Sequence, residues 1–127
     1  YLVGANLRGA ILSGSNLTLT SLVDANLNGA SLKAANLSGA KLTGAELPGA
    51  ELSGAEFTGT NLTGANLAGA DLTLANLVSV RLFQTDLRGV NLTFANMKEA
   101  DLTGANMNGA RLCNTTMPGG AVISSGC

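Results

Sequence analysis

The chain has 127 residues, of which 46% are hydrophobic but only 3% are aromatic, and its length suits a single domain. Seven Lys and Arg against eight Asp and Glu give a formal net charge of −1, so neither nucleic acid nor an anionic membrane is expected as a partner. There is no His, and Gly, Ser, Thr or Asn interrupts every apolar run before it could span a membrane. We therefore expect no enzyme activity and no cofactor.

Residues 1–4 are interpreted as an N-terminal lead-in to a repetitive tract. The chain starts with Tyr1 rather than Met. The sequence leaves open whether a preceding segment or signal peptide was removed, or whether this end pairs with another molecule.

Residues 5–119 form a five-residue repeat. Every fifth residue from Leu2 to Met117 is large and apolar, with twenty Leu, one Phe and three Met at 24 positions. The residue two places earlier is small, usually Ala, and the residue two places later is Gly in 15 of the 24 cases. We expect the large and small positions to point inward and the glycines to form corners.

A period of five excludes a straight helix and a straight strand. On an α-helix, steps of five residues would spread the apolar positions around the cylinder. On a straight strand, successive leucines would alternate between faces. The remaining solution is a coil of short extended pieces joined by corners, around a Leu and Ala core.

The number of extended pieces, or sides, in one turn of the coil can be inferred from the residue that precedes each large apolar residue. Asn occurs there at eight of twelve alternate positions and at only two of the eleven others. This ten-residue period indicates an even number of sides, and four is the natural choice. Asn6 and Asn26, or Asn16 and Asn36, are then neighbours in successive coils, and we expect their side chains to hydrogen-bond to each other.

The quintets resemble a known family. Ala5-Asn6-Leu7-Arg8-Gly9, Ala65-Asn66-Leu67-Ala68-Gly69 and Ala105-Asn106-Met107-Asn108-Gly109 are similar to the repeat of the pentapeptide repeat proteins, and the resemblance covers 23 consecutive quintets over residues 5–119. It implies an all-β fold, a right-handed quadrilateral β-helix of about six coils with four quintets in each coil.

Outward apolar residues are the local departure that could mark a binding site. Leu74, Val78, Phe83 and Phe94 stand where most quintets carry Gly or a polar residue, and Leu74 and Phe94 share one outward column. We interpret these four residues as a possible interaction patch. The alternative is that Phe94 packs flat on Leu74 as a local clasp.

The tail, residues 120–127, is expected to cap the last coil, because Val122 and Ile123 could cover the exposed layer of Leu112 and Met117. A disulfide between Cys113 and Cys127 would hold this cap in place. The alternative is two free thiols in a reducing cytosol. The tail is similar to the tails of cyanobacterial members of the family, in the stretch from Cys113 to Gly120 and in the final Gly126-Cys127. Some of these members are exported. We therefore favour the periplasm or the thylakoid lumen if the disulfide forms, and the cytoplasm otherwise.

Two catalytic hypotheses find little support in the residues. Ser and Thr are plentiful but have no His beside them, and two Cys without His fall short of a zinc site. Glu46, Glu51 and Glu56 lie on three successive faces, but a convex rod offers a glycosidase no pocket. We therefore predict no catalytic and no metal-binding residues.

The leading functional hypothesis is a non-enzymatic structural or protein-interaction module with an unknown protein partner, either monomeric or an end-to-end dimer. The resemblance also implies an alternative, because relatives that confer quinolone resistance mimic DNA and inhibit a topoisomerase such as gyrase. Those relatives are acidic, whereas the carboxylates here are nearly balanced by Lys and Arg.

Overall fold

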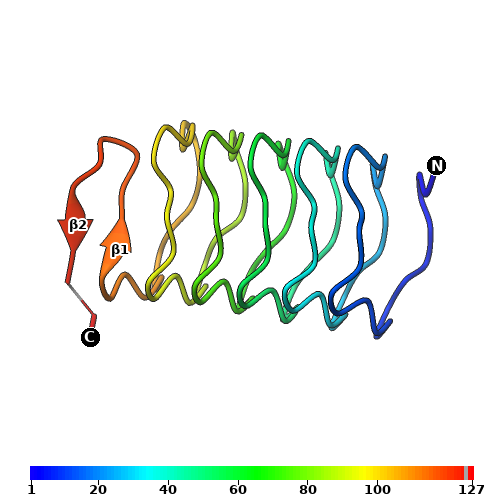
Figure 1. The fold of residues 1–127 in the computed structure, drawn as a ribbon, viewed down its shortest axis with the longest axis horizontal. Helices are drawn as coiled ribbons and strands as arrows, with labels where there is room; N and C mark the ends of the chain where they lie inside the picture. The colour runs from blue at the N-terminus through cyan, green and yellow to red at the C-terminus, as the bar shows by residue number, and fades with distance from the viewer. Residues whose placement is uncertain (125) are drawn as a thin grey trace.

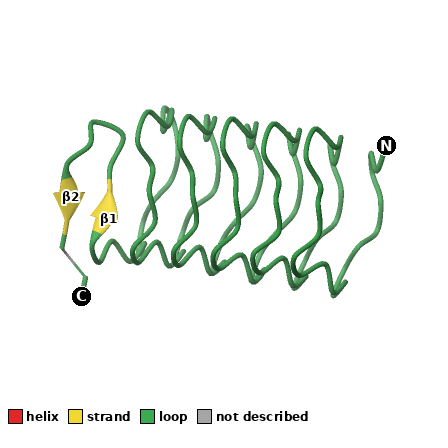
Figure 2. Ribbon diagram, viewed as in Figure 1, coloured by secondary structure: helices red, strands yellow, loops and turns green. Residues whose placement is uncertain are grey.

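The computed structural model describes residues 1–124 and 126–127 and winds the chain into a row of similar coils, with the termini at opposite ends (Figure 1). In these ranges there is no helix, and the regular strands are β1 (Thr115–Thr116) and β2 (Val122–Ile123) near the C-terminus (Figure 2). The described part of the chain accordingly has no helix that could cross a membrane. The fold is all-β, as the five-residue period predicts.

Parallel backbone bridges join residues twenty apart along the chain. The first joins Asn6 to Asn26, the last joins Asn96 to Thr116, and a new bridge begins at every fifth residue between them. Hydrogen bonds between neighbouring coils accompany each bridge; the Leu22 N–H, for example, donates to the Lys41 carbonyl at 2.7 Å. One circuit of the chain therefore takes four quintets, in agreement with the expected repeat.

Each quintet up to residue 114 ends in a tight turn, and the last residue of the quintet has a positive φ. After Leu22, the Ala25 N–H donates back to the Leu22 carbonyl at 3.0 Å, and the intervening Asp24 has a φ of 56°. Glycine adopts this left-handed conformation without a steric cost, which explains its frequency at the position. Residues other than glycine also occupy it: Leu19, Asp24, Ala34, Leu74, Ser79, Gln84, Phe94, Glu99 and Asn114.

The core is a column of inward side chains. From Leu22 to Met97, every large apolar residue of the repeat is at most 1% exposed, and the small residues between them are equally buried. Burying one such Leu contributes about 1.5 to 3 kcal/mol, so this column is the main stabilising feature. The first and last coils lack a neighbour on one side, and their large apolar residues are only partly buried.

Three buried threonines occupy the small position. The hydroxyls of Thr60, Thr85 and Thr115 donate to the carbonyls of Leu37, Leu62 and Leu92 at 2.6, 2.8 and 2.7 Å. Each acceptor is the carbonyl of a turn in the preceding coil. A polar group is therefore tolerated inside the column because the turn beside it offers an acceptor.

The tail leaves the coil after Met117. Residues 115–116 of β1 pair antiparallel with β2, with Thr115 opposite Ile123 and Thr116 opposite Val122, and the Met117 N–H donates to the Ala121 carbonyl at 2.8 Å. The tail includes Ser125, which lies outside the described residues. β2 thus replaces the next coil along one face only, and Leu102, Met107 and Leu112 stay only partly buried.

Candidate functional site

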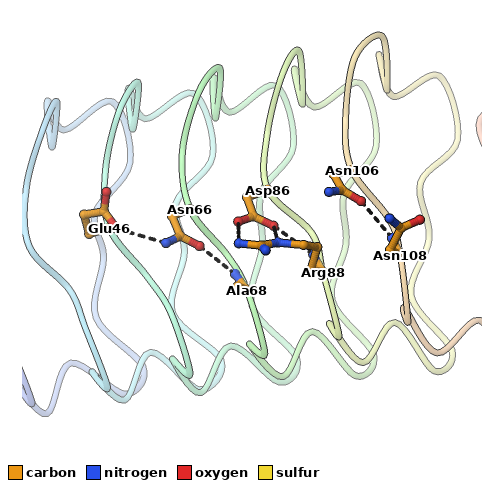
Figure 3. Close-up of polar contacts among 7 residues, drawn as sticks. All are labelled: Glu46, Asn66, Ala68, Asp86, Arg88, Asn106 and Asn108. Carbon is orange, nitrogen blue, oxygen red and sulfur yellow. Dashed lines mark hydrogen bonds and ion pairs between the residues drawn. The ribbon is translucent and has the colours of Figure 1, made fainter.

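The outward Asn and Asp residues close the turns of their own quintets. The Asn66 Oδ1 accepts a hydrogen bond from the Ala68 N–H at 2.9 Å, and the Asn106 Oδ1 accepts one from the Asn108 N–H at 3.1 Å (Figure 3). The same bond, from the backbone N–H two residues on, recurs in most quintets that carry Asn or Asp there. Such turn-closing bonds are typical of these two residue types.

This bond corrects one expectation from the sequence. Asn6 and Asn26 are bridged through their backbones, but their side chains do not bond to each other. The Asn6 Oδ1 accepts from the Arg8 N–H at 3.2 Å and the Asn26 Oδ1 from the Asn28 N–H at 3.0 Å. Asn16 and Asn36 behave in the same way, with Thr18 and Ser38 as donors. The turn provides a nearer donor than the neighbouring coil does.

One face carries a row of polar side chains on successive coils. Glu46, Asn66, Asp86 and Asn106 are consecutive bridge partners and lie in line along the rod (Figure 3). The Asn66 Nδ2 donates to the Glu46 Oε2 at 3.1 Å, and the Arg88 guanidinium donates to both oxygens of Asp86, at 2.9 and 2.6 Å. Every acidic group of this row therefore has a partner.

The Arg88 pair shifts the titration of both its members. Its side-chain hydrogen bonds lower the pKa of Asp86 below the usual value of a carboxyl, and the same bonds raise the pKa of the Arg88 guanidinium. At the end of the rod, the hydroxyl of Thr103 donates to the Asp101 Oδ1 at 2.6 Å and lowers the pKa of that carboxyl as well. Both carboxylates are thus ionised at neutral pH, which excludes them as general acids.

The three glutamates considered for catalysis are held apart on different faces. Glu46 bonds to Asn66, Glu56 accepts from the Asn76 Nδ2 at 3.0 Å, and Glu51 forms an ion pair with Lys33 at 2.9 Å. A shallow hollow of about 380 Å³ lies near the N-terminus, but its lining contains none of these carboxylates. Within residues 1–124 and 126–127, no cluster of His, Cys, Asp or Glu could hold a metal ion.

Two of the four outward apolar residues come together. The register of twenty residues places Leu74 and Phe94 at the same corner of successive coils, and their N–H groups donate to Thr93 and Cys113 of the coils that follow. Leu74 remains 63% exposed and Phe94 56% exposed. Both have positive φ values, 61° and 59°. The structure therefore contains a corner pair of two large apolar side chains.

The other two residues of the expected patch lie elsewhere on the rod. Val78 belongs to the turn of the next quintet and Phe83 to the turn after that, so each faces a different corner. Phe83 is separated from the column of Leu74 and Phe94 by half a coil, which places it diagonally across the rod. Of the four residues, Leu74 and Phe94 alone occupy the same corner of successive coils.

Cys113 and Cys127 are joined by a disulfide, with their Cα atoms 4.6 Å apart. The end of the tail is also held by the Arg111 Nε, which donates to the Gly126 carbonyl at 3.2 Å. The tail is therefore fixed to the last coil at β1 and again near its final residues.

A family model described as Pentapeptide repeats matches eight copies at residues 1–39, 35–73 and 81–117. The chain belongs to the pentapeptide repeat family. A search of curated proteins found no match.

Solved structures of pentapeptide repeat proteins are similar to this one. Rfr23, from the cyanobacterium Cyanothece 51142, is 30% identical with a TM-score of 0.69, over 83% of this chain and 82% of that one. HetL, a protein involved in heterocyst differentiation regulation from the cyanobacterium Nostoc, is 30% identical over 93% and 68%, with a TM-score of 0.43. A trypsin-treated variant of QnrB1, a plasmid-mediated fluoroquinolone resistance protein, is 19% identical over 88% and 67%, with a TM-score of 0.56. The likeness to QnrB1 concerns the fold alone.

The ion pair of Asp86 with Arg88 is a feature that analysis of the sequence missed. The sequence could have indicated this pair, because Asp86 and Arg88 flank the inward Leu87 and both point outward from one pentapeptide. The buried bonds of Thr60, Thr85 and Thr115 were missed because the five-residue pattern identifies an inward position but not the acceptor beside it.

Proposed function

We propose that this pentapeptide repeat protein is a non-enzymatic module that binds another protein through the corner pair of Leu74 and Phe94. The supporting observation is that both side chains are large, apolar and more than half exposed, in a backbone conformation that disfavours them. A left-handed residue other than glycine costs about 1 to 2 kcal/mol. These residues therefore add strain and recover little burial, which is expected where a partner supplies the missing contact.

The proposal includes the finer architecture of the rod. We propose a right-handed quadrilateral β-helix of about six coils, supported by the bridges between residues twenty apart. Residues 1–4 lead into the first coil, residues 5–119 form the β-helix, and residues 120–127 cap its end. The pairing of β2 with β1 and the disulfide support the role of the tail as a cap. In this arrangement a rigid wall presents the corner pair at a fixed position.

The experiment compares three changes at one corner. Leu74→Gly and Phe94→Gly remove the apolar pair and the strain together, whereas Ala34→Gly, at an exposed position of the same column with a φ of 56°, removes the strain alone. Each protein is immobilised, exposed to an extract of the source organism and analysed by mass spectrometry. We expect proteins captured by the parent and by Ala34→Gly to be lost from Leu74→Gly and Phe94→Gly.

Stability measurements on the same variants separate the patch from a local clasp. If the pair acts as a binding surface, all three variants should unfold at the same denaturant concentration as the parent or stabilise the protein by up to about 1 kcal/mol. Destabilisation of Leu74→Gly and Phe94→Gly, with the captured proteins unchanged, would instead establish the clasp and refute the proposal.

Mimicry of DNA, the alternative for a gyrase inhibitor, requires a continuous negative surface. Here the Lys33–Glu51 and Arg88–Asp86 pairs place a cation beside a carboxylate on two faces. Neutralised carboxylates do not reproduce the charge density of a phosphate backbone. The charge pattern therefore favours an apolar contact with a partner protein.

We also propose that the protein works in an oxidising compartment, the periplasm or the thylakoid lumen. The disulfide between Cys113 and Cys127 supports this location, because such bonds persist in oxidising compartments and are rare in the cytosol.

A further inference from the structure

Two Asn-Gly pairs occupy equivalent corners of the rod. Asn28-Gly29 and Asn108-Gly109 are separated by four coils of twenty residues, so both lie in one column, and each is followed by Ala. The turn geometry is the same, with the Asn N–H bonded to Asn26 in one case and to Asn106 in the other. The two glycines have φ values of 67° and 75°.

The two pairs differ in the hydrogen bonding of the glycine. The Gly29 N–H donates to the Pro48 carbonyl of the next coil at 3.2 Å. In the part of the chain that the structure describes, the Gly109 N–H has no such acceptor, because the chain turns away into β2 after Met117 and leaves this face uncovered. Asn108 is also exposed, whereas Asn28 is half-buried.

The backbone nitrogen of the glycine is the attacking group in a known reaction of Asn-Gly sequences, the deamidation of Asn. The glycine backbone nitrogen loses its proton to solvent and attacks the side-chain carbonyl carbon of Asn. A new C–N bond forms, the bond to the side-chain amide nitrogen breaks, and ammonia leaves. Water then opens the cyclic imide at either carbonyl and gives Asp or isoaspartate. The reaction consumes one water, releases one ammonia and involves no change of oxidation state.

We propose that Asn108 is a site of spontaneous deamidation and that the coil structure protects Asn28 from the same reaction. Attack by Gly29 requires its nitrogen to rotate toward Asn28, and this rotation breaks the hydrogen bond to Pro48. Attack by Gly109 breaks no such bond. The reacting water reaches Asn108 directly because this residue is exposed.

The product changes the end of the rod chemically. Asp or isoaspartate at position 108 adds one negative charge to an uncovered face, and isoaspartate also lengthens the backbone by one atom at a turn. Asn106 holds this turn through the N–H of residue 108 (Figure 3). The modification therefore alters the last coil and leaves the interior coils unchanged.

The test is to incubate the purified full chain in mildly alkaline buffer and to monitor both sites by peptide mapping and mass spectrometry. We expect the folded protein to convert Asn108 about fivefold faster than Asn28, or more, the factor that corresponds to one backbone hydrogen bond. A parallel incubation in denaturant is the control. There the two sites should react at similar rates, because Leu27-Asn28-Gly29-Ala30 and Met107-Asn108-Gly109-Ala110 are nearly the same sequence.

Three results would overturn the proposal: equal rates in the folded protein, faster conversion of Asn28, or no conversion of Asn108 in the folded chain. If Asn108 also reacted faster than Asn28 in denaturant, by the same ratio as in the folded protein, the proposal would be overturned as well. The difference between the two rates would then come from the local sequence. The variant Gly109→Ala, read by the same mapping, should slow the reaction of Asn108 by obstructing the attack and leave Asn28 unchanged.

Discussion

The interior coils and the last coil are built from the same quintets but differ in how they are held. Leu62 lies in the interior and is fully buried, with a neighbouring coil on each side. Leu102 occupies the equivalent position two coils later and is only half-buried. The last coil is secured instead by β2, by the disulfide and by the contact of Arg111 with Gly126.

The comparison shows that the contribution of one quintet to the free energy of folding is not constant along the rod. Its contribution depends on the coils beside it, as in other repeat proteins where nearest-neighbour interfaces supply most of the free energy of folding. At the end of the rod, where one interface is missing, a non-repetitive segment and a covalent bond replace it. Variants in the core, at the disulfide and on the surface can test this division between interior and end.

The largest expected effect is on the core column. Leu62→Ala should reduce the free energy of unfolding by about 2 to 5 kcal/mol, because it leaves a cavity between two coils. Leu102→Ala should cost less, because that side chain is only partly buried and lacks a coil on one side. Denaturant unfolding of both variants measures the difference. Equal losses would contradict the dependence on neighbouring coils.

The next effect concerns the disulfide. Replacing Cys113 and Cys127 by Ser removes a link between residues 14 apart, which the chain-entropy model values at roughly 3 kcal/mol. We expect faster amide hydrogen exchange in β1, β2 and the last coil. Exchange from Leu22 to Leu77 should stay unchanged, because the hydrogen-bond partners of these residues lie in coils before the last one. Uniform loss of protection along the rod would show that the end and the interior unfold together.

The smallest effect is electrostatic and lies in the interior. The pKa of Asp86 is lower in the folded state than in the unfolded chain, so its ionised form stabilises the fold above the unfolded pKa, and this contribution is lost as the pH falls through the folded value. Asp86→Asn should cost no more than about 1 kcal/mol at neutral pH, because solvent screens the exposed Arg88. The difference from the parent should vanish in acid.

A matched variant isolates the ion pair in this measurement. Asp71→Asn keeps the turn bond to the Thr73 N–H, and Asp71 has no ion pair in the described part of the chain. It is measured in the same unfolding series as a variant that removes a carboxylate without removing an ion pair. The same pH dependence in both variants would rule out Arg88 as its cause.

Most of the fold could be predicted from the sequence because a single pattern specifies it. The five-residue period separates inward Leu and Ala from outward polar residues, and the alternation of Asn gives the even number of sides. The tail could be anticipated only in part. Val122 and Ile123 indicate a segment that packs on the last coil, but nothing in their order shows that β2 runs antiparallel to β1.

The candidate site was less predictable, because it depends on side-chain direction and backbone conformation. The column of Leu74 and Phe94 follows from the repeat, whereas the placement of Phe83 across the rod requires the corner geometry. The bonds of Asn6 and Asn26 were assigned to the wrong partner because two donors were within reach and the sequence could not rank them. Periodicity predicts columns well and individual contacts poorly.

The bridge spacing restricts how genes for such proteins can change in length. Removing twenty residues from the interior would return every downstream side chain to the column it occupied before. Removing five residues would keep the leucines inside. It would, however, rotate the part of the rod after the deletion by one face relative to the part before it. A deletion of five between Leu74 and Phe94 would thus part the two side chains while sparing the core. Insertions and deletions of whole coils are therefore the ones that preserve a binding surface.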